Sequence, residues 1–467
     1  MVITILFFIY PKQGIQIGEL QFNFFDKSRF YVTDTIIEKE IIKKEINKDS
    51  ILAVHKMIED SIKREQELLR QKYLDSVLNA EKKIQFPNDD ITILSSFFKK
   101  LDKAKNKKVR IMHYGDSQIE ADRISGRLRE RLQKEFGGFG AGAYAVIPAT
   151  RKISIKNEYS DNWVRRTGFG PYIDTAVKHK KYGALFSFCE IMPTVKDSSL
   201  VYEASIKVGK PTKSYKHCRD YRKFDIYYTS EDTSIFTFLL EDSIIRLDTI
   251  LPTLNIKRKS LKFNRAPSSF ELKISAISSP LIYGMSLEGN NGFVVDNIPM
   301  RGASGTEFAR IDKTSLREMH KLLAPDLFLM EFGGNTIPYM KSEERCKKYG
   351  KYFKSQILKL KRINPDAQVI VIGPADMAKK DKLNFVSYPF IEEVRNAMKA
   401  AAFETNSCFW DTYLNMGGSG SIQDWVGLSP PLAARDYIHF TNKGARKVAD
   451  MFIEDLMDAY TFYKNNK

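Results

Sequence analysis

Residues 108–117 read KVRIMHYGDS, and this stretch decides the fold class. The apolar run at 109–114 is typical of a buried strand, and the glycine, aspartate and serine at 115–117 are typical of a tight turn. A helical pattern follows, with apolar residues four positions apart over 124–132. Strand, turn and helix in this order form the opening unit of a doubly wound α/β fold, so we predict that fold here.

The same alternation of strands and helices returns after residue 284. Apolar strands there end in small turn residues, and amphipathic helices follow them. The strands are expected at 292–297, 326–331, 368–372 and 408–413, and the helices at 342–362, 388–404 and 441–463. We expect these segments to complete the sheet that begins with residues 109–114.

Residues 151–283 follow a different pattern, in which apolar and polar residues alternate and long helical patterns are missing. Runs of this kind, such as 200–208 and 234–240, indicate half-buried strands. We therefore predict an all-β, sandwich-like domain at 151–283. It interrupts a single α/β domain that consists of residues 89–150 and 284–467.

The N-terminal residues differ again, since residues 2–10 are almost all apolar. This run is shorter than the roughly 20 residues that a membrane-spanning helix needs, but it suits the core of a signal peptide. The basic segment that usually precedes such a core is missing, so an N-terminal strand is the alternative. Residues 1–30 are a candidate signal or anchor segment, which favours export, and residues 31–88 are expected to be mainly helical.

The composition is that of a folded, basic protein. The chain has 467 residues, and its 74 Lys and Arg against 57 Asp and Glu give a net charge of +17. A basic surface can attract nucleic acid, anionic lipid or an acidic glycan. The positive charges are spread out and no nucleic-acid-binding motif is present, so we predict no nucleic-acid partner. Association with a membrane or a cell wall stays open.

The four cysteines do not form a metal-binding motif. Cys189, Cys218, Cys346 and Cys408 are too far apart in sequence for a CxxC pair, and we predict no metal site. Cys189 and Cys218 could form a disulfide in an exported protein. Buried thiols are the favoured interpretation.

Ser117 stands where a turn between a strand and a helix would expose its hydroxyl at the carboxyl end of the sheet. N–H groups at the start of the helix would point to the same place and could stabilise an oxyanion. A serine hydroxyl is a good nucleophile only when a neighbouring base takes its proton. Taken alone, the motif favours a serine that caps a helix, so a catalytic assignment needs a base.

Six histidines are candidates for that base. His439 stands out because it precedes the last helix and follows Asp436 by three residues, so a curled loop lets the carboxylate orient the imidazole. A residue at the start of the helix is the alternative for His439. His113 is expected in the core, and His55 and His320 are expected at the surface of charged helices.

Two further segments follow predicted strands and carry hydrogen-bond donors. Asn335 comes after an apolar strand and two glycines, so its amide could point across the strand ends toward Ser117. An asparagine that favours a turn is the alternative. Residues 301–306, which read RGASGT, follow the strand at 292–297. A glycine there lets a backbone N–H approach a substrate closely.

Together these segments resemble the SGNH or GDSL hydrolases. The resemblance covers about residues 108–150 and 284–460, and the order of the segments is the same. GDS at 115–117, Gly-x-x-Gly at 302–305, GGN at 333–335 and DxxH at 436–439 are similar to the four blocks of that family. The resemblance implies an SGNH-type three-layer α/β/α domain with a parallel sheet.

The resemblance also implies a role for each of these residues. Ser117 would be the nucleophile, His439 the base and Asp436 the residue that orients the base. The oxyanion hole would consist of the N–H groups of Ser117 and Gly305 and the side chain of Asn335. No cofactor is implied.

A narrower likeness concerns the substrate. HYGDSQ at 113–118 and the split domain resemble bacterial cell-surface members, among them peptidoglycan O-acetylesterases, in which the insert resembles a carbohydrate-binding module. Gln118 replaces the leucine of the GDSL name, as is common among extracellular members. Trp163, Tyr172 and Tyr182 could stack on sugars, although packing in the core is favoured.

By this resemblance the protein is a serine esterase that removes small acyl groups, above all acetyl, from an extracytoplasmic carbohydrate such as peptidoglycan. The expected partner is an acylated glycan substrate, and the expected location is the periplasm or the cell surface. An O-acyltransferase with the same triad is one alternative, because a sugar hydroxyl can resolve an acyl-enzyme as water does. A non-catalytic, glycan-binding envelope protein is the other.

Overall fold

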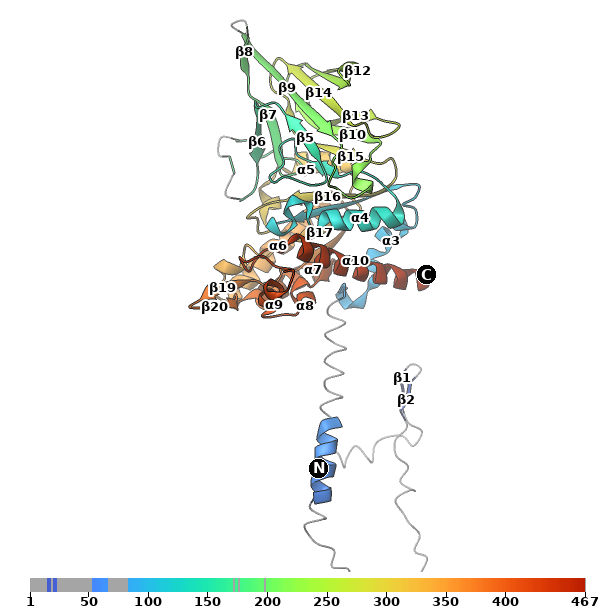
Figure 1. The fold of residues 1–467 in the computed structure, drawn as a ribbon, viewed down its shortest axis with the longest axis vertical. Helices are drawn as coiled ribbons and strands as arrows, with labels where there is room; N and C mark the ends of the chain where they lie inside the picture. The colour runs from blue at the N-terminus through green and yellow to red at the C-terminus, as the bar shows by residue number, and fades with distance from the viewer. Residues whose placement is uncertain are drawn as a thin grey trace, which may run out of the picture. The chain divides into compact units, whose positions relative to one another are not determined.

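The computed structural model describes residues 15–17, 20–22, 53–65, 83–170, 173–174, 177–196 and 199–466 (Figure 1). The chain divides into two units, Met1–Gln71 and Lys72–Lys467. In the first unit, β1 (Ile15–Ile17) pairs antiparallel with β2 (Leu20–Phe22), and residues 53–65 form a helix. The apolar residues 2–10 and most of the helix expected over 31–88 lie outside the described residues.

A parallel sheet of five strands forms the centre of the second unit (Figure 1). Its order is β16 (Gly292–Pro299), β3 (Lys108–Gly115), β17 (Leu327–Glu331), β18 (Gln368–Ile372) and β21 (Cys408–Trp410). All neighbouring strands are parallel, so their carboxyl ends meet at one edge. β3 ends at that edge, directly before Ser117.

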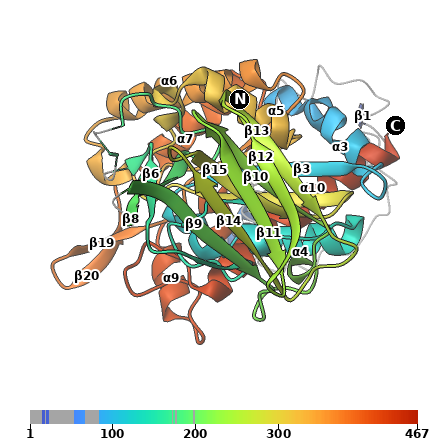
Figure 2. The same cartoon turned by 90° about the horizontal axis from the view of Figure 1, so that it is seen from above.

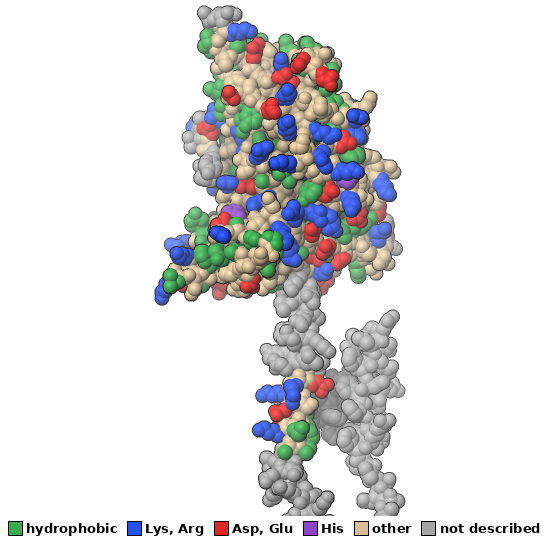
Figure 3. All heavy atoms as spheres, viewed as in Figure 1, with side chains coloured by type: hydrophobic (Ala, Val, Ile, Leu, Met, Phe, Trp, Pro, Cys, Tyr) green, Lys and Arg blue, Asp and Glu red, His purple; other side chains and the backbone are tan. Residues whose placement is uncertain are grey.

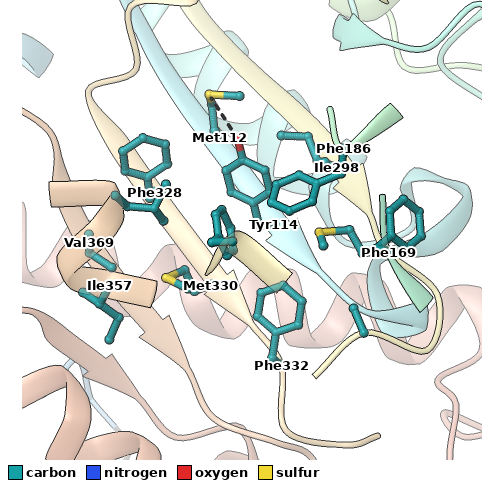
Figure 4. Packing of buried hydrophobic residues seen from close by; sticks show 14 of the residues in the cluster. Met112, Tyr114, Phe169, Phe186, Ile298, Phe328, Met330, Phe332, Ile357 and Val369 are labelled. Atoms are coloured by element: carbon teal, nitrogen blue, oxygen red, sulfur yellow. Dashed lines mark hydrogen bonds between the residues drawn. The ribbon is translucent and has the colours of Figure 1, made fainter. Parts of the chain in front are cut away.

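Helices cover both faces of this sheet, which gives three layers. One face packs against α5 (Lys313–Leu323), α6 (Glu343–Ile363) and α7 (Ile391–Phe403). The other face packs against α3 (Ser95–Leu101), α4 (Ser125–Phe136) and α10 (Asn442–Asn465). Figure 4 shows part of the first core, where Tyr114 and Met330 from neighbouring strands lie among other buried apolar side chains. The predicted α/β/α fold is confirmed.

Two antiparallel sheets form the β-rich domain (Figure 2). The first contains β13 (Thr253–Lys262), β10 (Lys223–Ser230), β15 (Leu281–Glu288), β7 (Ser187–Ile191) and β6 (Trp163–Thr167) in this order, with β4 (Gly142–Tyr144) beside β15. The second contains β12 (Ser243–Ile250), β11 (Ser234–Leu240), β14 (Ser269–Ala276), β9 (Ser199–Gly209) and β5 (Lys156–Tyr159), with β8 (Thr194–Lys196) beside β9. Phe224 and Met285 of the first sheet share one apolar core with Phe236 and Leu272 of the second, as the predicted sandwich requires.

The antiparallel sheets extend beyond residues 151–283 at both ends. β4 precedes this range and pairs with β15, and most of β15, which pairs with β10, follows it. β15 is followed after a short turn by β16 of the parallel sheet, so one segment joins the two sets of strands. Buried ion pairs fasten this junction. Arg110 of β3 contacts Asp296 of β16, with Nη1 and Oδ1 2.7 Å apart, and it also contacts Glu288 of β15. The domain limits themselves stay a prediction.

The expectation that His320 lies at the surface is wrong. Its side chain on α5 is 1% exposed, and both ring nitrogens have partners at 2.9 Å, the Tyr114 hydroxyl at Nε2 and the Asn364 amide nitrogen at Nδ1. His320 lies on the same face of α5 as the buried Leu316 and Leu323. The charged residues next to it in sequence led to the expectation of a surface position. Burial lowers the pKa of His320 to about 3, so the ring is neutral.

Other side chains agree with the favoured interpretations. Trp163 and Tyr182 are buried, and Tyr172 lies outside the described residues. All four cysteines are buried free thiols. Among the described residues, the helices are either too short or too polar to span a bilayer.

Short elements connect the later strands to the last helix. They are the strands β19 (Ala378–Asp381) and β20 (Asn384–Ser387), which form an antiparallel hairpin, and the helices α8 (Thr412–Met416) and α9 (Ser421–Gly427). The strand expected at 408–413 ends at Trp410, because Asp411 caps α8 through a hydrogen bond of 3.0 Å from Leu414 N to its Oδ1. Short 3-10 helices are found at Pro87–Asp89, Ile91–Leu94, His217–Arg219, Glu307–Arg310 and Ile337–Tyr339.

Candidate active site

Ser117 begins the 3-10 helix η4 (Ser117–Asp122), directly after the turn that ends β3. The turn is tight, because a β-carbon on Gly115 would lie 3.0 Å from the carbonyl oxygen of Glu331 and 3.0 Å from the Ile119 side chain. Asp116 caps η4, since its Oδ1 accepts a hydrogen bond of 2.9 Å from Gln118 N. The local sequence thus holds the Ser117 hydroxyl at the carboxyl edge of the parallel sheet.

The imidazole of His439 lies between Ser117 and Asp436. Its Nε2 is 2.8 Å from Ser117 Oγ, and its Nδ1 is 2.8 Å from Asp436 Oδ2. The other carboxylate oxygen of Asp436 accepts hydrogen bonds from the backbone N–H groups of Ile438 at 2.9 Å and His439 at 3.0 Å. Because a carboxylate only accepts, Nδ1 carries the proton in the neutral ring and Nε2 is free to accept the proton of Ser117.

Two carboxyl groups at this site differ in their electrostatics. Burial raises the pKa of Asp436, but hydrogen bonds from the N–H and the ring of His439 outweigh it, so the pKa falls below its ordinary value. Asp436 is therefore ionised at neutral pH, as an acid that orients an imidazole must be. Burial raises the pKa of Asp116 to about 7 against the hydrogen bond from Gln118 N, and the nearby charge of Glu331 adds to the rise.

The Ser117 hydroxyl and the His439 ring open on a pocket of about 190 Å³. Residues at or just after the carboxyl ends of β3, β17, β18 and β21 line it, together with residues of the His439 loop. The lining residues are Asp116, Ser117, Gln118, Glu331, Phe332, Gly334, Asn335, Pro338, Tyr339, Gly373, Pro374, Ala375, Met377, Thr412, Ile438 and His439. A ligand in this pocket would contact both the hydroxyl and the imidazole.

Asn335 lines this pocket, whereas Gly305 is not among its lining residues. The Asn335 amide donates a hydrogen bond of 3.1 Å to Ala303 O, and its second N–H has no acceptor among the described residues. Gly305 has a φ of +81°, and a β-carbon on it would lie 2.6 Å from Phe353 and 2.8 Å from Phe332. The structure brings Asn335 to the pocket and packs Gly305 against its aromatic support. Their part in an oxyanion hole stays a prediction.

Two residues that received no role from the sequence join the Ser117 turn to the loop that carries the imidazole. Gln118 Nε2 donates a hydrogen bond of 2.6 Å to Ile438 O, and Gln118 Oε1 accepts one of 3.3 Å from Phe440 N. Arg123 donates to Phe440 O at 2.7 Å and to Ser117 O at 2.8 Å. The departure from leucine at position 118 was the sequence signal that could have drawn attention to this link.

The site contains a hydroxyl, an imidazole and a carboxylate that are linked by hydrogen bonds in this order. Such a set can deprotonate a serine and support attack on a carbonyl carbon. Within the part of the chain that the structure describes, no group of three or more His, Cys, Asp or Glu side chains could hold a metal ion. The residues present fit acyl transfer to and from a serine.

The sequence of residues 282–447 matches the GDSL-like lipase/acylhydrolase family. Residues 282–447 thus carry the sequence pattern of a GDSL-like acylhydrolase domain. The matched stretch begins near the end of the antiparallel sandwich, so it contains Asn335, Asp436 and His439 but not Ser117. In the folded protein, Ser117 lies next to the matched stretch, within hydrogen-bonding distance of His439. Because the family consists of acylhydrolases, the protein is a carboxylic ester hydrolase.

Solved structures similar to this chain include several esterases. A peptidoglycan O-acetylesterase aligns with a TM-score of 0.60 and 18% identity over 78% of this chain and 96% of that one, which shows a shared fold. An acetyl xylan esterase aligns with a TM-score of 0.26 and 20% identity over 35% of this chain and 80% of that one. A family two carbohydrate esterase from Clostridium thermocellum aligns with a TM-score of 0.24 and 8% identity over 63% and 98% of the two chains. No curated protein sequence matches the chain.

Proposed function

We propose that the protein removes small acyl groups, in particular acetyl groups, from an extracytoplasmic carbohydrate such as peptidoglycan. In this proposal Ser117 is the nucleophile, His439 is the base and Asp436 orients the base. One observation carries it, namely the two hydrogen bonds of 2.8 Å that link Ser117 Oγ through the imidazole to the Asp436 carboxylate.

The reaction passes through an acyl-enzyme. His439 Nε2 takes the proton of Ser117 while Oγ attacks the ester carbonyl carbon, and the imidazolium returns that proton to the leaving sugar oxygen. Water then gives a proton to the same imidazole and attacks the acyl carbon, and the bond to Ser117 Oγ breaks as the imidazolium returns the proton to Oγ, which releases the acid and restores the Ser117 hydroxyl. In both steps the Ser117 N–H and the Asn335 amide hold the oxyanion, with the Gly305 N–H as the third predicted donor.

The size of the pocket favours a small acyl group. Its volume of about 190 Å³ is little more than the roughly 150 Å³ of a cavity that holds one benzene molecule. A pocket of this size favours an acetyl group over a long fatty acyl chain. Tyr339, one of the lining residues, is 75% exposed, so a sugar ring outside the pocket could pack against its aromatic face.

The remaining support concerns the alcohol part of the ester. The similar structure with a TM-score of 0.60 is that of a peptidoglycan O-acetylesterase. The net charge of +17 suits a polymer that carries carboxylates, and Lys and Arg side chains are scattered over the face shown in Figure 3. A cell-wall glycan that carries both O-acetyl groups and carboxylates fits this support, and an enzyme that acts on it works outside the cytoplasm.

Turnover of p-nitrophenyl acetate tests the esterase part of the proposal. Ser117→Ala and His439→Ala are expected to lose nearly all activity while circular dichroism shows a folded protein. Ser355→Ala is the control, because Ser355 is an exposed serine on α6 and should leave the rate unchanged. A wild-type rate in Ser117→Ala would rule out Ser117 as the nucleophile.

Release of acetate from O-acetylated peptidoglycan, compared with release from acetylated xylan, tests the substrate. We expect faster release from peptidoglycan. Release from xylan alone would contradict the proposed glycan, and net transfer of acetyl to a glycan acceptor in excess of hydrolysis would identify an acyltransferase instead.

A further inference from the structure

Aromatic contacts hold the residues on either side of His439. Tyr437 stacks on Phe385 of β20, with ring centroids 3.7 Å apart and an angle of 11° between the planes. Phe440 packs against Trp425 of α9 with ring centroids 5.6 Å apart. These contacts hold the side chains of Tyr437 and Phe440. The peptide groups on either side of His439, which set the direction of its imidazole, need hydrogen-bond partners of their own.

The partners of those peptide groups come from the Ser117 turn. Gln118 Nε2 donates a hydrogen bond of 2.6 Å to Ile438 O, and Gln118 Oε1 accepts one of 3.3 Å from Phe440 N. A single carboxamide therefore holds the backbone before and after His439. Gln118 directly follows Ser117, and its backbone N–H donates to Asp116 Oδ1 at 2.9 Å, so the residue belongs to the Ser117 turn.

Arg123 forms a second bridge between the same two segments. Its guanidinium donates to Phe440 O at 2.7 Å and to Ser117 O at 2.8 Å. Its Nε donates to Glu120 O at 3.1 Å, which anchors the group within the Ser117 turn. Hydrogen bonds from a charged donor are stronger than neutral ones, and the planar guanidinium fixes the direction of each.

We propose that Gln118 and Arg123 are positioning residues that set the distance between the nucleophile Ser117 and the base His439. The inference rests on the proposed function, because it concerns the reaction of those two residues. The sequence separation of 322 residues makes such a link necessary, since no local chain geometry relates the two loops. A displacement of about 1 Å at a reacting group can cost roughly 10²-fold in rate.

The residue type at position 118 is decisive for this role. Leucine, which the GDSL name has at that position, carries neither a donor nor an acceptor. With leucine, Ile438 O and Phe440 N–H would both lose their partners, and the loop would have to find others or admit water. Gln118 thus replaces an apolar contact with a hydrogen-bonded one.

Kinetics of Gln118→Leu and Arg123→Ala test the inference. Each is expected to lower kcat for p-nitrophenyl acetate about 10- to 100-fold while KM changes less than about two-fold, because the base is displaced whereas the lining residues other than Gln118 stay in place. The rate of labelling of Ser117 by a fluorophosphonate should fall by a similar factor. Arg123→Lys should keep more activity than Arg123→Ala, since an ammonium can still donate to the carbonyls. The double variant should lose less than the product of the single losses.

Arg127→Ala is the matched control. Arg127 lies one helical turn after Arg123, and its guanidinium pairs with Asp450 of α10 at 2.8 Å. The variant removes the same side chain from a neighbouring position, so its kcat should match that of the wild type. Melting temperatures show which variants are folded.

Two results would overturn the inference. One is a wild-type kcat and labelling rate in folded Gln118→Leu and Arg123→Ala, and the other is a raised KM with an unchanged kcat. Ser117→Ala separates this inference from the proposed function. Activity that survives Ser117→Ala contradicts the function itself, whereas an inactive Ser117→Ala beside a fully active Gln118→Leu contradicts only the positioning role.

Discussion

His439 Nε2 lies 2.8 Å from the hydroxyl of Ser117, although 322 residues separate the two in sequence. The contact arises because β3 ends beside the loop that precedes α10, although the antiparallel sandwich and four strands of the parallel sheet lie between them in the chain. A base at this distance is what a serine needs to become a nucleophile.

Asp436→Asn is expected to lower kcat for p-nitrophenyl acetate about 10²- to 10⁴-fold. The amide keeps the shape of the carboxylate, but it can donate to His439 Nδ1 and thereby favour the tautomer with the proton on Nε2. The carboxylate is 47% exposed, so water can replace part of its effect. Asp424→Asn, on the exposed side of α9, is the control. Activity of Asp436→Asn within about two-fold of the wild type would show that the carboxylate does not orient the base.

Asn335→Ala is expected to lower kcat about 10²- to 10³-fold with little change in KM. The lost N–H acts on the oxyanion, which forms in the transition state and not in the bound ester. Steady-state kinetics on p-nitrophenyl acetate measure both constants. A loss confined to KM would indicate a residue that binds the ground state instead.

Gly305→Ala is expected to destabilise the fold by more than about 1 kcal/mol. The glycine has a φ of +81°, and the added β-carbon would lie within 2.8 Å of the buried rings of Phe332 and Phe353. Gly427→Ala is the control, because nothing lies within 4 Å of a β-carbon there and its φ is not positive. Urea denaturation should show a loss for Gly305→Ala alone. Equal stability of the two variants would mean that the Gly305 turn relaxes without cost.

Because His320 is buried, we predict that the free energy of unfolding falls in acid. Burial lowers its pKa from 6.5 to about 3 in the folded protein, so the unfolded chain takes up this proton first as the pH falls. The free energy of unfolding should therefore decrease between pH 6.5 and about pH 3, and His320→Gln should reduce that slope. Urea denaturation of both proteins across this range measures the difference. Identical slopes would contradict a neutral, buried His320.

The fold could be predicted to a large extent because its signals are local. The apolar strand at 109–114 and the helix after it follow from hydrophobic spacing, and the alternating runs within 151–283 follow in the same way. What local spacing does not show is how strands pair. β15 begins as the last strand of the sandwich and leads directly into β16, so the two architectures share one continuous segment.

The site was less predictable where partners are distant. Ser117, Asn335 and His439 each follow a strand or precede a helix, which sequence patterns can locate. The burial of His320 depends instead on the hydroxyl of Tyr114 and the amide of Asn364, which satisfy both ring nitrogens. Such pairings are invisible before the chain is folded.

The same limit applies to the link between the Ser117 turn and the His439 loop. Gln118 and Arg123 bond to backbone groups of Ile438 and Phe440, and backbone groups leave no trace in a sequence. Only the unusual residue type at position 118 offered a signal, and its meaning required the folded loop.

The most direct test of the account is covalent labelling of the active protein with a fluorophosphonate, followed by mass spectrometry of its peptides. The account predicts one adduct per chain, on Ser117, and its loss in His439→Ala, because the imidazole 2.8 Å away must take the proton of the hydroxyl. A folded protein that hydrolyses p-nitrophenyl acetate but stays unlabelled, or that carries the adduct on another serine, would contradict it.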